Sequence, residues 1–433
     1  GGRVKAEAEF VRRGNSYWHL LCSLSMADQQ LSVTPSDFEQ MFVAAASALE
    51  SAGLSWGDAA WCNLYLRSMD LFGAINGVYN RFVTQRGPPS RACVELALPE
   101  PQLLQLDVLL RAPPPPSPPP RRTLHVQSVS EWAPPCIGPY SQGVVSGGLA
   151  FMAGQISLDP PSMQIVQGGL QAEVRQALLN CQAAAVALKT SITTGLLTIT
   201  SIISERAGPD APQSVASEVA HLGKSAWLDG SQEEEDGEWP LDAYLMPPDL
   251  PAPHWQPLLL HMVVPRLPKE ALVEFLPFAA SGDEELRAAL ESGELGSSDL
   301  PDNPFTTWSI GWVGAPGRLL VCRAFLPLAA LEHGSEPAHL HSAALQTHLT
   351  EQLNGLLRRL NLTWSSVVAV RINYTPDHSA VGLARGLAEG NLGNRYTVAA
   401  GGVANRAVLV PALKLGRFGA MDDAVAVELL ATQ

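Results

Sequence analysis

Residues that could bind a metal or act as nucleophiles are scattered through this sequence. The six cysteines include no Cys-x-x-Cys pair and have no zinc-finger spacing, so they do not predict a zinc site. Most fall within apolar segments, where cysteine behaves as a small hydrophobic residue, which indicates a reducing compartment. His333, His339 and His341 lie close together, but no acidic residue or cysteine has a fixed spacing to them. We therefore expect no metal in this chain.

The segment from residue 137 to 161 has a more specific pattern. It contains Ile137-Gly-Pro-Tyr-Ser-Gln142, a turn at Gly147-Gly148, an apolar run from Leu149 to Ile156 and a stop at Asp159-Pro-Pro161. Turn residues at both ends of an apolar run predict a β-hairpin. The residues that follow predict a helix, because apolar side chains recur there with the spacing of one buried stripe: Leu170, Val174, Leu178, Cys181, Ala185 and Leu188.

This segment resembles the opening of the Rid/YjgF family of small α+β domains, which is also labelled endoribonuclease L-PSP. The matching motifs are Ile137-Gly-Pro-Tyr-Ser-Gln142, Ala153-Gly-Gln155 and Arg175-Gln-Ala-Leu-Leu-Asn180, in the same order. The resemblance implies a chorismate-mutase-like fold, in which a mixed β-sheet carries two helices on one face.

The same resemblance implies a set of site residues. In this family an arginine within a Pro-x-Arg-x-Cys-Val segment holds the carboxylate of a small imine or enamine acid. The segment 89–94 matches, so Arg91 takes the catalytic position and Cys93 lies beside it in the ligand site. A planar guanidinium suits this role because it binds a carboxylate through two parallel hydrogen bonds. Tyr140 takes a position that lines the family's pocket, and Gly154 takes one that borders it.

Family members that hydrolyse imines also use a glutamate at the start of the last strand, where it positions or activates water. Counting from a shared Leu-Pro turn assigns this position to Gln105 in one part of the chain and to the catalytic candidate Glu274 in another. The arginine position falls near Leu259 or Leu260 in the second part, and Arg406 could match it in the third. No part carries the complete pair, so we expect imine hydrolysis to be weak.

Internal repeats predict three tandem Rid-like units. Asn361-Leu-Thr-Trp-Ser365 repeats Gly53-Leu-Ser-Trp-Gly57, and Leu267-Pro268 matches Leu98-Pro99. The expected organisation is unit 1 at 1–112 with an incomplete opening hairpin, a proline-rich linker at 113–122, unit 2 at 123–280 with an acidic, partly disordered insertion at about 205–253, a polar linker at 281–304, and a divergent unit 3 at 305–433.

Composition excludes several classes of protein. The net charge is −14, and lysines and arginines form no run beyond Arg121-Arg122 and Arg358-Arg359. Nucleic-acid binders usually carry a basic stripe, so we expect no nucleic-acid partner. No apolar run reaches about 18 residues and no secretory signal opens the chain, so we expect a cytoplasmic protein without a membrane partner. The first residue is Gly1, which indicates a fragment or a processed chain.

Tandem Rid-like domains with an acidic insertion resemble the C-terminal half of the long eukaryotic diphthine–ammonia ligases. That family completes diphthamide on elongation factor 2 with ATP and ammonium, so the resemblance implies elongation factor 2 as the substrate of a full protein. Ser146-Gly147-Gly148 resembles the start of the PP-loop signature Ser-Gly-Gly-x-Asp-Ser, but Leu149-Ala150 replaces the rest. We therefore expect ATP to bind in an N-terminal domain missing here, and no cofactor in this chain.

Three functions stay open at this point. The chain could be the Rid-like part of such a ligase, serving as a scaffold, a docking platform or a source of ammonia. It could be a free-standing enamine/imine deaminase, or an interaction module with degenerate pockets. Single-domain members of the family form homotrimers, and three linked units have a high effective concentration for one another. We therefore predict a monomeric chain folded as an intramolecular pseudo-trimer.

Overall fold

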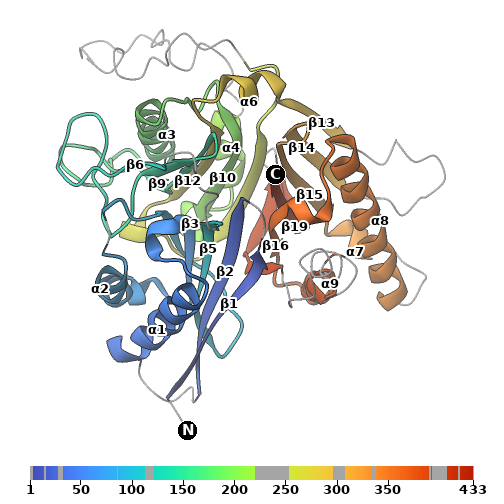
Figure 1. Cartoon of the computed structure of the whole chain (residues 1–433). Coiled ribbons are helices and arrows are strands. Elements are labelled where there is room, and N and C mark those ends of the chain that lie inside the picture. Colours follow the sequence, from blue (N-terminus) through green and yellow to red (C-terminus); the bar gives the residue numbers. More distant parts are fainter. Residues whose placement is uncertain are drawn as a thin grey trace.

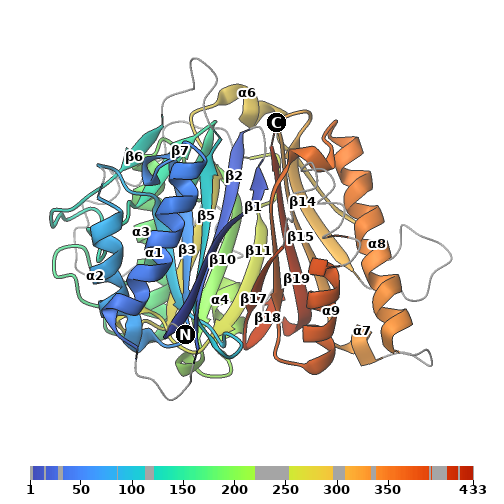
Figure 2. The same cartoon turned by 60° about the horizontal axis from the view of Figure 1, so that its bottom comes forward.

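The computed structural model shows helices on the outside of the molecule and strands that face one another in its middle (Figure 1 and Figure 2). None of the helices in the described ranges is long and apolar enough to cross a membrane. The structure describes residues 3–13, 16–27, 33–84, 86–112, 121–219, 253–295, 308–332, 338–389, 392, 407–417 and 420–432.

Unit 1 opens with a β-hairpin, because β1 (Val4–Arg13) and β2 (Tyr17–Met26) pair antiparallel. The prediction of an incomplete opening hairpin is therefore wrong. Thr34 and Pro35 begin the first helix as predicted, and the Asp37 carboxylate accepts hydrogen bonds from Thr34 N (2.8 Å) and Oγ1 (2.7 Å). The unit continues with α1 (Pro35–Ser51), β3 (Ala59–Leu66), α2 (Phe72–Phe82), β4 (Ser90–Glu95) and β5 (Gln102–Arg111).

Unit 2 contains the predicted hairpin and helix. The helical stripe is buried at Val174, Leu178 and Cys181. The insertion begins later than predicted, because residues 205–207 form a 3-10 turn and α4 (Ala211–Val219) packs into the unit's core. Residues 220–252 lie outside the described ranges. Its elements are β6 (Arg122–Leu124), β7 (Gly143–Ser146), β8 (Leu149–Met152), β9 (Gln155–Ile156), α3 (Leu170–Ala187), β10 (Leu196–Ser204), α4 (Ala211–Val219), β11 (Leu258–Val264) and β12 (Val273–Ala280).

Part of the predicted linker at 281–304 is folded. Asp283 caps α6 (Glu284–Ala289) through a 2.8 Å hydrogen bond from Leu286 N, and β13 (Glu291–Leu295) pairs with β14 (Ser309–Ala315). The linker prediction is wrong over these residues, because the alternation of acidic and small residues there hid a short edge strand. The proline-rich linker at 113–120 lies outside the described residues.

Unit 3 has the two-helices-on-a-sheet architecture. The repeated Trp motif forms the same 3-10 turn in units 1 and 3, at Trp56–Asp58 and Trp364–Ser366. The elements of the unit are β14 (Ser309–Ala315), β15 (Leu319–Pro327), α7 (Ala329–Glu332), α8 (Ala338–Arg359), β16 (Val367–Tyr374), α9 (His378–Glu389), β17 (Val408–Pro411), β18 (Lys414–Arg417) and β19 (Ala420–Thr432).

The three units share one strand order. It runs β1-β2-β5-β3-β4 in unit 1, β7-β8-β12-β10-β11 in unit 2 and β14-β15-β19-β16-β17 in unit 3. The sheets of units 2 and 3 are continuous, because β18 pairs antiparallel with β11. The chain is thus an α+β protein of tandem Rid-like domains.

Helices cover only one face of each sheet, and the other faces pack against one another. One apolar cluster between the units contains Tyr17, Phe151 and Val321, and a second contains Val94, Met262 and Val410, so both draw side chains from all three units. Burial of these faces removes apolar surface from water that a single unit could not cover. The units therefore form an intramolecular pseudo-trimer.

The inward faces also bury a charged cluster. Asp107 on β5 is fully buried and accepts hydrogen bonds from His19, from Asn63 Nδ2 (3.3 Å) and from Arg371 Nε of unit 3 (2.5 Å). The Arg371 guanidinium lies 4.5 Å from the centroid of the Trp61 ring. Burial alone would raise the pKa of Asp107, but Arg371 and His19 lower this pKa well below its usual range. The carboxylate is therefore ionised, and unit 3 supplies its counter-charge.

A second arginine of unit 3 connects to unit 2. The Arg323 guanidinium donates hydrogen bonds to the carbonyls of Ile199 (2.7 Å) and Leu258 (2.9 Å) and to the Thr200 hydroxyl (2.6 Å), and it pairs with Glu428 at 2.8 Å. Arg371 and Arg323 thus attach unit 3 to each of the other two units.

The Asp107–Arg371 pair should be strongly coupled. Arg371→Met should lower the free energy of unfolding by about 3–5 kcal/mol, because it leaves a buried carboxylate without its counter-charge. Asp107→Asn/Arg371→Met should be less destabilised than the sum of the two single variants, with a coupling of about 0.5–3 kcal/mol. Urea unfolding of the wild type, the two single variants and the double variant measures this coupling. Strictly additive changes in the free energy of unfolding would contradict a coupled ion pair.

Candidate functional site

The sheet register identifies equivalent positions in the three units. The predicted glutamate position is occupied by Gln105 in unit 1, Glu274 in unit 2 and Ala426 in unit 3, each paired with the matching residue of the neighbouring strand. Arg91 lies opposite Cys62 on β3, and Leu259 occupies the corresponding place on β11, opposite Ile199. Arg406 lies outside the described residues.

Arg91 and Glu274 nevertheless lie in one site, because they come from adjacent units. Gly154 N donates a hydrogen bond to the Arg91 carbonyl (3.2 Å), and a Cβ on Gly154 would lie only 1.7 Å from Glu274 Oε1. Burial raises the pKa of Glu274, and the nearby charge of Arg91 opposes this rise. Although no single unit holds the pair, the interface between units 1 and 2 assembles it.

Aromatic rings and an amide hold the Arg91 guanidinium. Its Nη2 donates to Asn76 Oδ1 at 2.7 Å, and its Cζ lies 4.7 Å from the Tyr79 ring centroid and 5.3 Å from that of Tyr140. Gly138 approaches so closely that a Cβ there would lie 2.7 Å from Nη2. Nη1 is buried and has no hydrogen-bond partner within the described part of the chain. Arg91 is therefore fixed in place with one donor nitrogen unused.

Asn76 and Tyr79 were missed at the level of sequence. Both lie on α2, whose apolar residues Ile75 and Val78 face the core. Asn76 could have been recognised in the sequence as a partner of Arg91, because it is a polar residue within a helical stretch near the strand that carries Arg91.

Glu274 has an unusual environment for a carboxyl group. It is 3% exposed, and its Oε2 is buried without a hydrogen-bond partner among the residues described. Burial raises its pKa to about 8, against the opposing effect of the Arg91 charge. At neutral pH the group is mostly protonated, so it can donate a proton and then accept one.

Two other predicted residues have different surroundings. Burial raises the pKa of the Cys93 thiol to about 12, although Arg91 lowers it, so this thiol is not a ready nucleophile. Gln105 donates from Nε2 to the Leu409 carbonyl at 3.3 Å, which places it between units 1 and 3. Its role in ligand binding stays a prediction.

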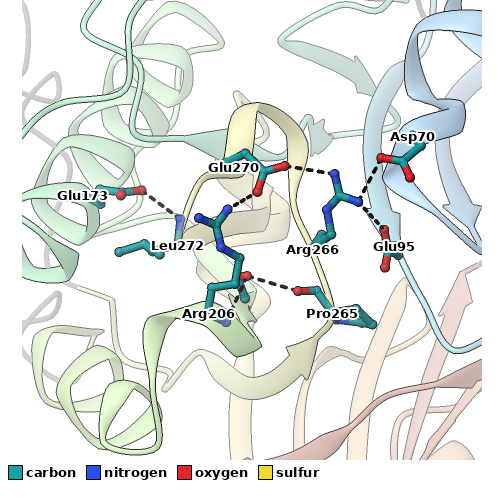
Figure 3. A network of polar contacts seen from close by, with 9 residues as sticks. Asp70, Glu95, Glu173, Arg206, Pro265, Arg266, Glu270 and Leu272 are labelled. Atoms are coloured by element: carbon teal, nitrogen blue, oxygen red, sulfur yellow. Dashed lines mark hydrogen bonds and ion pairs between the residues drawn. The ribbon is translucent and has the colours of Figure 1, made fainter.

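Polar contacts at one edge of the interface hold β4 against unit 2. Arg266 Nη1 lies 3.0 Å from Asp70 Oδ1 and 4.0 Å from Glu95 Oε2, and Nη2 lies 3.0 Å from Glu270 Oε1 (Figure 3). Glu95 N also donates to the Arg266 carbonyl at 3.2 Å. Partly exposed ion pairs contribute little free energy. Their effect here is to position the end of the strand that carries Arg91.

The protonation of Glu274 can be measured directly. Its carboxyl carbon should titrate near pH 8 in NMR of the ¹³C-Glu-labelled chain, and this signal should be absent from Glu274→Gln. A raised pKa means that the folded state binds the proton more tightly than the unfolded state does. The free energy of unfolding should therefore decrease as the pH rises from about 4.3 to the pKa of the folded state. Glu274→Gln should lose this fall, whereas the exposed control Glu50→Gln should keep it. A Glu274 titration near pH 4 would contradict the burial argument.

Comparisons with known proteins identify the family. A family model described as endoribonuclease L-PSP matches residues 27–105 and 130–226. A RutC family protein of Pyrococcus horikoshii is 32% identical over 112 residues, covering 23% of this chain and 89% of that protein. The diphthine–ammonia ligase of Schizosaccharomyces pombe is 35% identical over 117 residues, and the match covers 27% of this chain and only 18% of that ligase.

A shorter match covers 11% of this chain and 35% of a human protein named 2-iminobutanoate/2-iminopropanoate deaminase, with 50% identity over 48 residues. The matched motifs and the repeated strand order agree with one another, and the Pyrococcus relative is covered over most of its length. The chain belongs to the Rid/YjgF family, described as endoribonuclease L-PSP.

Proposed function

We propose that this chain is the Rid-like part of a diphthine–ammonia ligase, and that its site between units 1 and 2 hydrolyses a small 2-imino acid to a 2-keto acid and ammonia. The assembly of Arg91 and Glu274 in one buried site supports this proposal best. Relatives named for diphthine–ammonia ligation and for imine deamination both match the chain. Ammonia would be the product of the second reaction and a substrate of the first, which is how a Rid-like part could serve such a ligase.

Arg91 is suited to binding the substrate carboxylate. Its Nη2 is already held by Asn76, so the unused Nη1 is the donor that a carboxylate oxygen would accept from. Tyr79 and Tyr140 fix the guanidinium plane and exclude water from it. A charged hydrogen bond in such a site is stronger than in water.

Glu274 is suited to moving protons. In its neutral form it protonates the imine nitrogen, and as a carboxylate it then accepts a proton from the water that attacks the C=N carbon. Glu274 returns that proton to the amino group of the resulting carbinolamine, so that ammonia can leave. As the carbonyl forms, the carbinolamine hydroxyl gives its proton to the Glu274 carboxylate, which is neutral again as at the start. A pKa near the working pH favours both steps.

Imine hydrolysis should therefore depend on both residues. With 2-iminopropanoate generated in place by an amino-acid oxidase, the chain should accelerate pyruvate release. Arg91→Ala and Glu274→Gln should each lower kcat/KM by about 10²–10⁴-fold. The exposed control Arg81→Ala should retain activity. Wild-type activity in Glu274→Gln would overturn the proton-transfer role, and activity in neither wild type nor control would favour a non-catalytic module.

Ligation is proposed to need a separate ATP-binding domain, because no phosphate-cradling PP-loop signature occurs in this sequence. We expect elongation factor 2 bearing diphthine to gain no amide when incubated with this chain, ATP and ammonium. Mass spectrometry of the modified peptide measures this, and amide formation by the chain alone would refute the assignment of ligation to another domain.

A further inference from the structure

A cavity of about 80 Å³ lies where the inward sheet faces of the three units meet. Its walls include Trp61 and Ala92 of unit 1, Thr198 of unit 2, and Ala369 and Arg371 of unit 3. It is distinct from the Arg91 site, since neither Arg91 nor Glu274 lines it. We propose that this cavity binds a small carboxylate, of the size of formate or acetate, and that Arg371 holds its oxygens.

The guanidinium of Arg371 is the main reason to expect an anionic ligand in this cavity. The residue is 8% exposed, and its Nε is committed to Asp107 at 2.5 Å. Its terminal nitrogens donate to no residue that the structure describes, although the side chain lines the cavity. A guanidinium with two free, parallel N–H groups matches the two oxygens of a carboxylate. Trp61 fixes the plane of the guanidinium, so little conformational entropy is lost on binding.

The other charges that face the cavity are already neutralised. Glu428 accepts from Arg323 (2.8 Å) and from Asn373 Nδ2 (3.0 Å), which satisfies both of its oxygens. Asp107 does not line the cavity, but it balances the charge of Arg371 through Nε. A ligand carboxylate would therefore be held by the unused terminal N–H groups of Arg371 rather than by an excess of positive charge.

Size and polarity define the ligand class further. An apolar cavity of about 150 Å³ accommodates benzene, so the present volume suits a ligand with only a few heavy atoms. The wall also contains Ala92, Phe151 and Phe278, whose apolar side chains suit a hydrogen or a methyl group. The ligand would contact all three units at once, so its binding should also stabilise their assembly.

The proposal can be tested without interference from the other site. The Arg91→Ala chain, labelled with ¹³C at alanine methyl groups, is titrated with sodium acetate at constant ionic strength. The signals of Ala92 and Ala369, assigned through Ala92→Gly and Ala369→Gly, should shift saturably. Acetamide, which has the same shape without the charge, should cause no shift at equal concentration.

Three variants separate the expected outcome from the alternatives. Thr198→Leu should abolish the shifts, because the larger side chain fills the cavity that Thr198 lines. Ala369→Leu, read from Ala92, is a second blocking variant should Thr198→Leu not fold. Arg371→Lys should weaken binding about tenfold, because it removes the two-pronged hydrogen bond. The proposal is overturned by the absence of shifts, by equal shifts with acetamide, or by unchanged binding in a folded blocking variant.

Discussion

The buried ion pair between Asp107 and Arg371 is the interaction on which the arrangement of the three units depends. A carboxylate with no exposed surface is tolerated only when its charge is paired and its oxygens accept hydrogen bonds. Unit 1 supplies His19 and Asn63, and the only guanidinium on this carboxylate, among the residues described, comes from unit 3. A rotation of unit 3 against unit 1 would therefore separate Arg371 from this carboxylate and leave the buried charge unpaired.

Covalent linkage explains how the interfaces could become different. In a homotrimer every pocket is built from the same residues, so a substitution at one interface occurs at all of them. Here the position that holds Arg91 in unit 1 holds Leu259 in unit 2, and the position of Glu274 holds Gln105 in unit 1 and Ala426 in unit 3. The charged pair is thus assembled between units 1 and 2. Gln105 packs structurally at another interface, where its amide binds the Leu409 carbonyl.

The features predicted correctly from the sequence are those that depend on residues close together in the chain. The Gly147-Gly148 turn, the buried stripe of α3 and the Thr34-Pro35 helix start are local, and each was recognisable from its periodicity or its turn residues. The opening hairpin of unit 1 was missed because β1 alternates charged and small residues and carries little hydrophobic signal. The meeting of Arg91 with Glu274 could not be predicted by comparing positions within a unit, because it depends on which unit packs against which.

Charged residues within apolar strands indicate a buried ion pair, and the predictions from sequence did not draw on them. Asp107 lies in β5, whose other central residues are nearly all apolar, and Arg371 interrupts β16 in the same way. A strand buried on both faces tolerates such a residue only if a partner of opposite charge reaches it. The register also connects this pair to the candidate site, because Asn63, which binds Asp107, lies opposite Ala92, the residue that follows Arg91. A rotation of unit 3 that broke the central pair would therefore disturb the strand that carries Arg91, so the geometry of the site depends on closure of the whole ring of units.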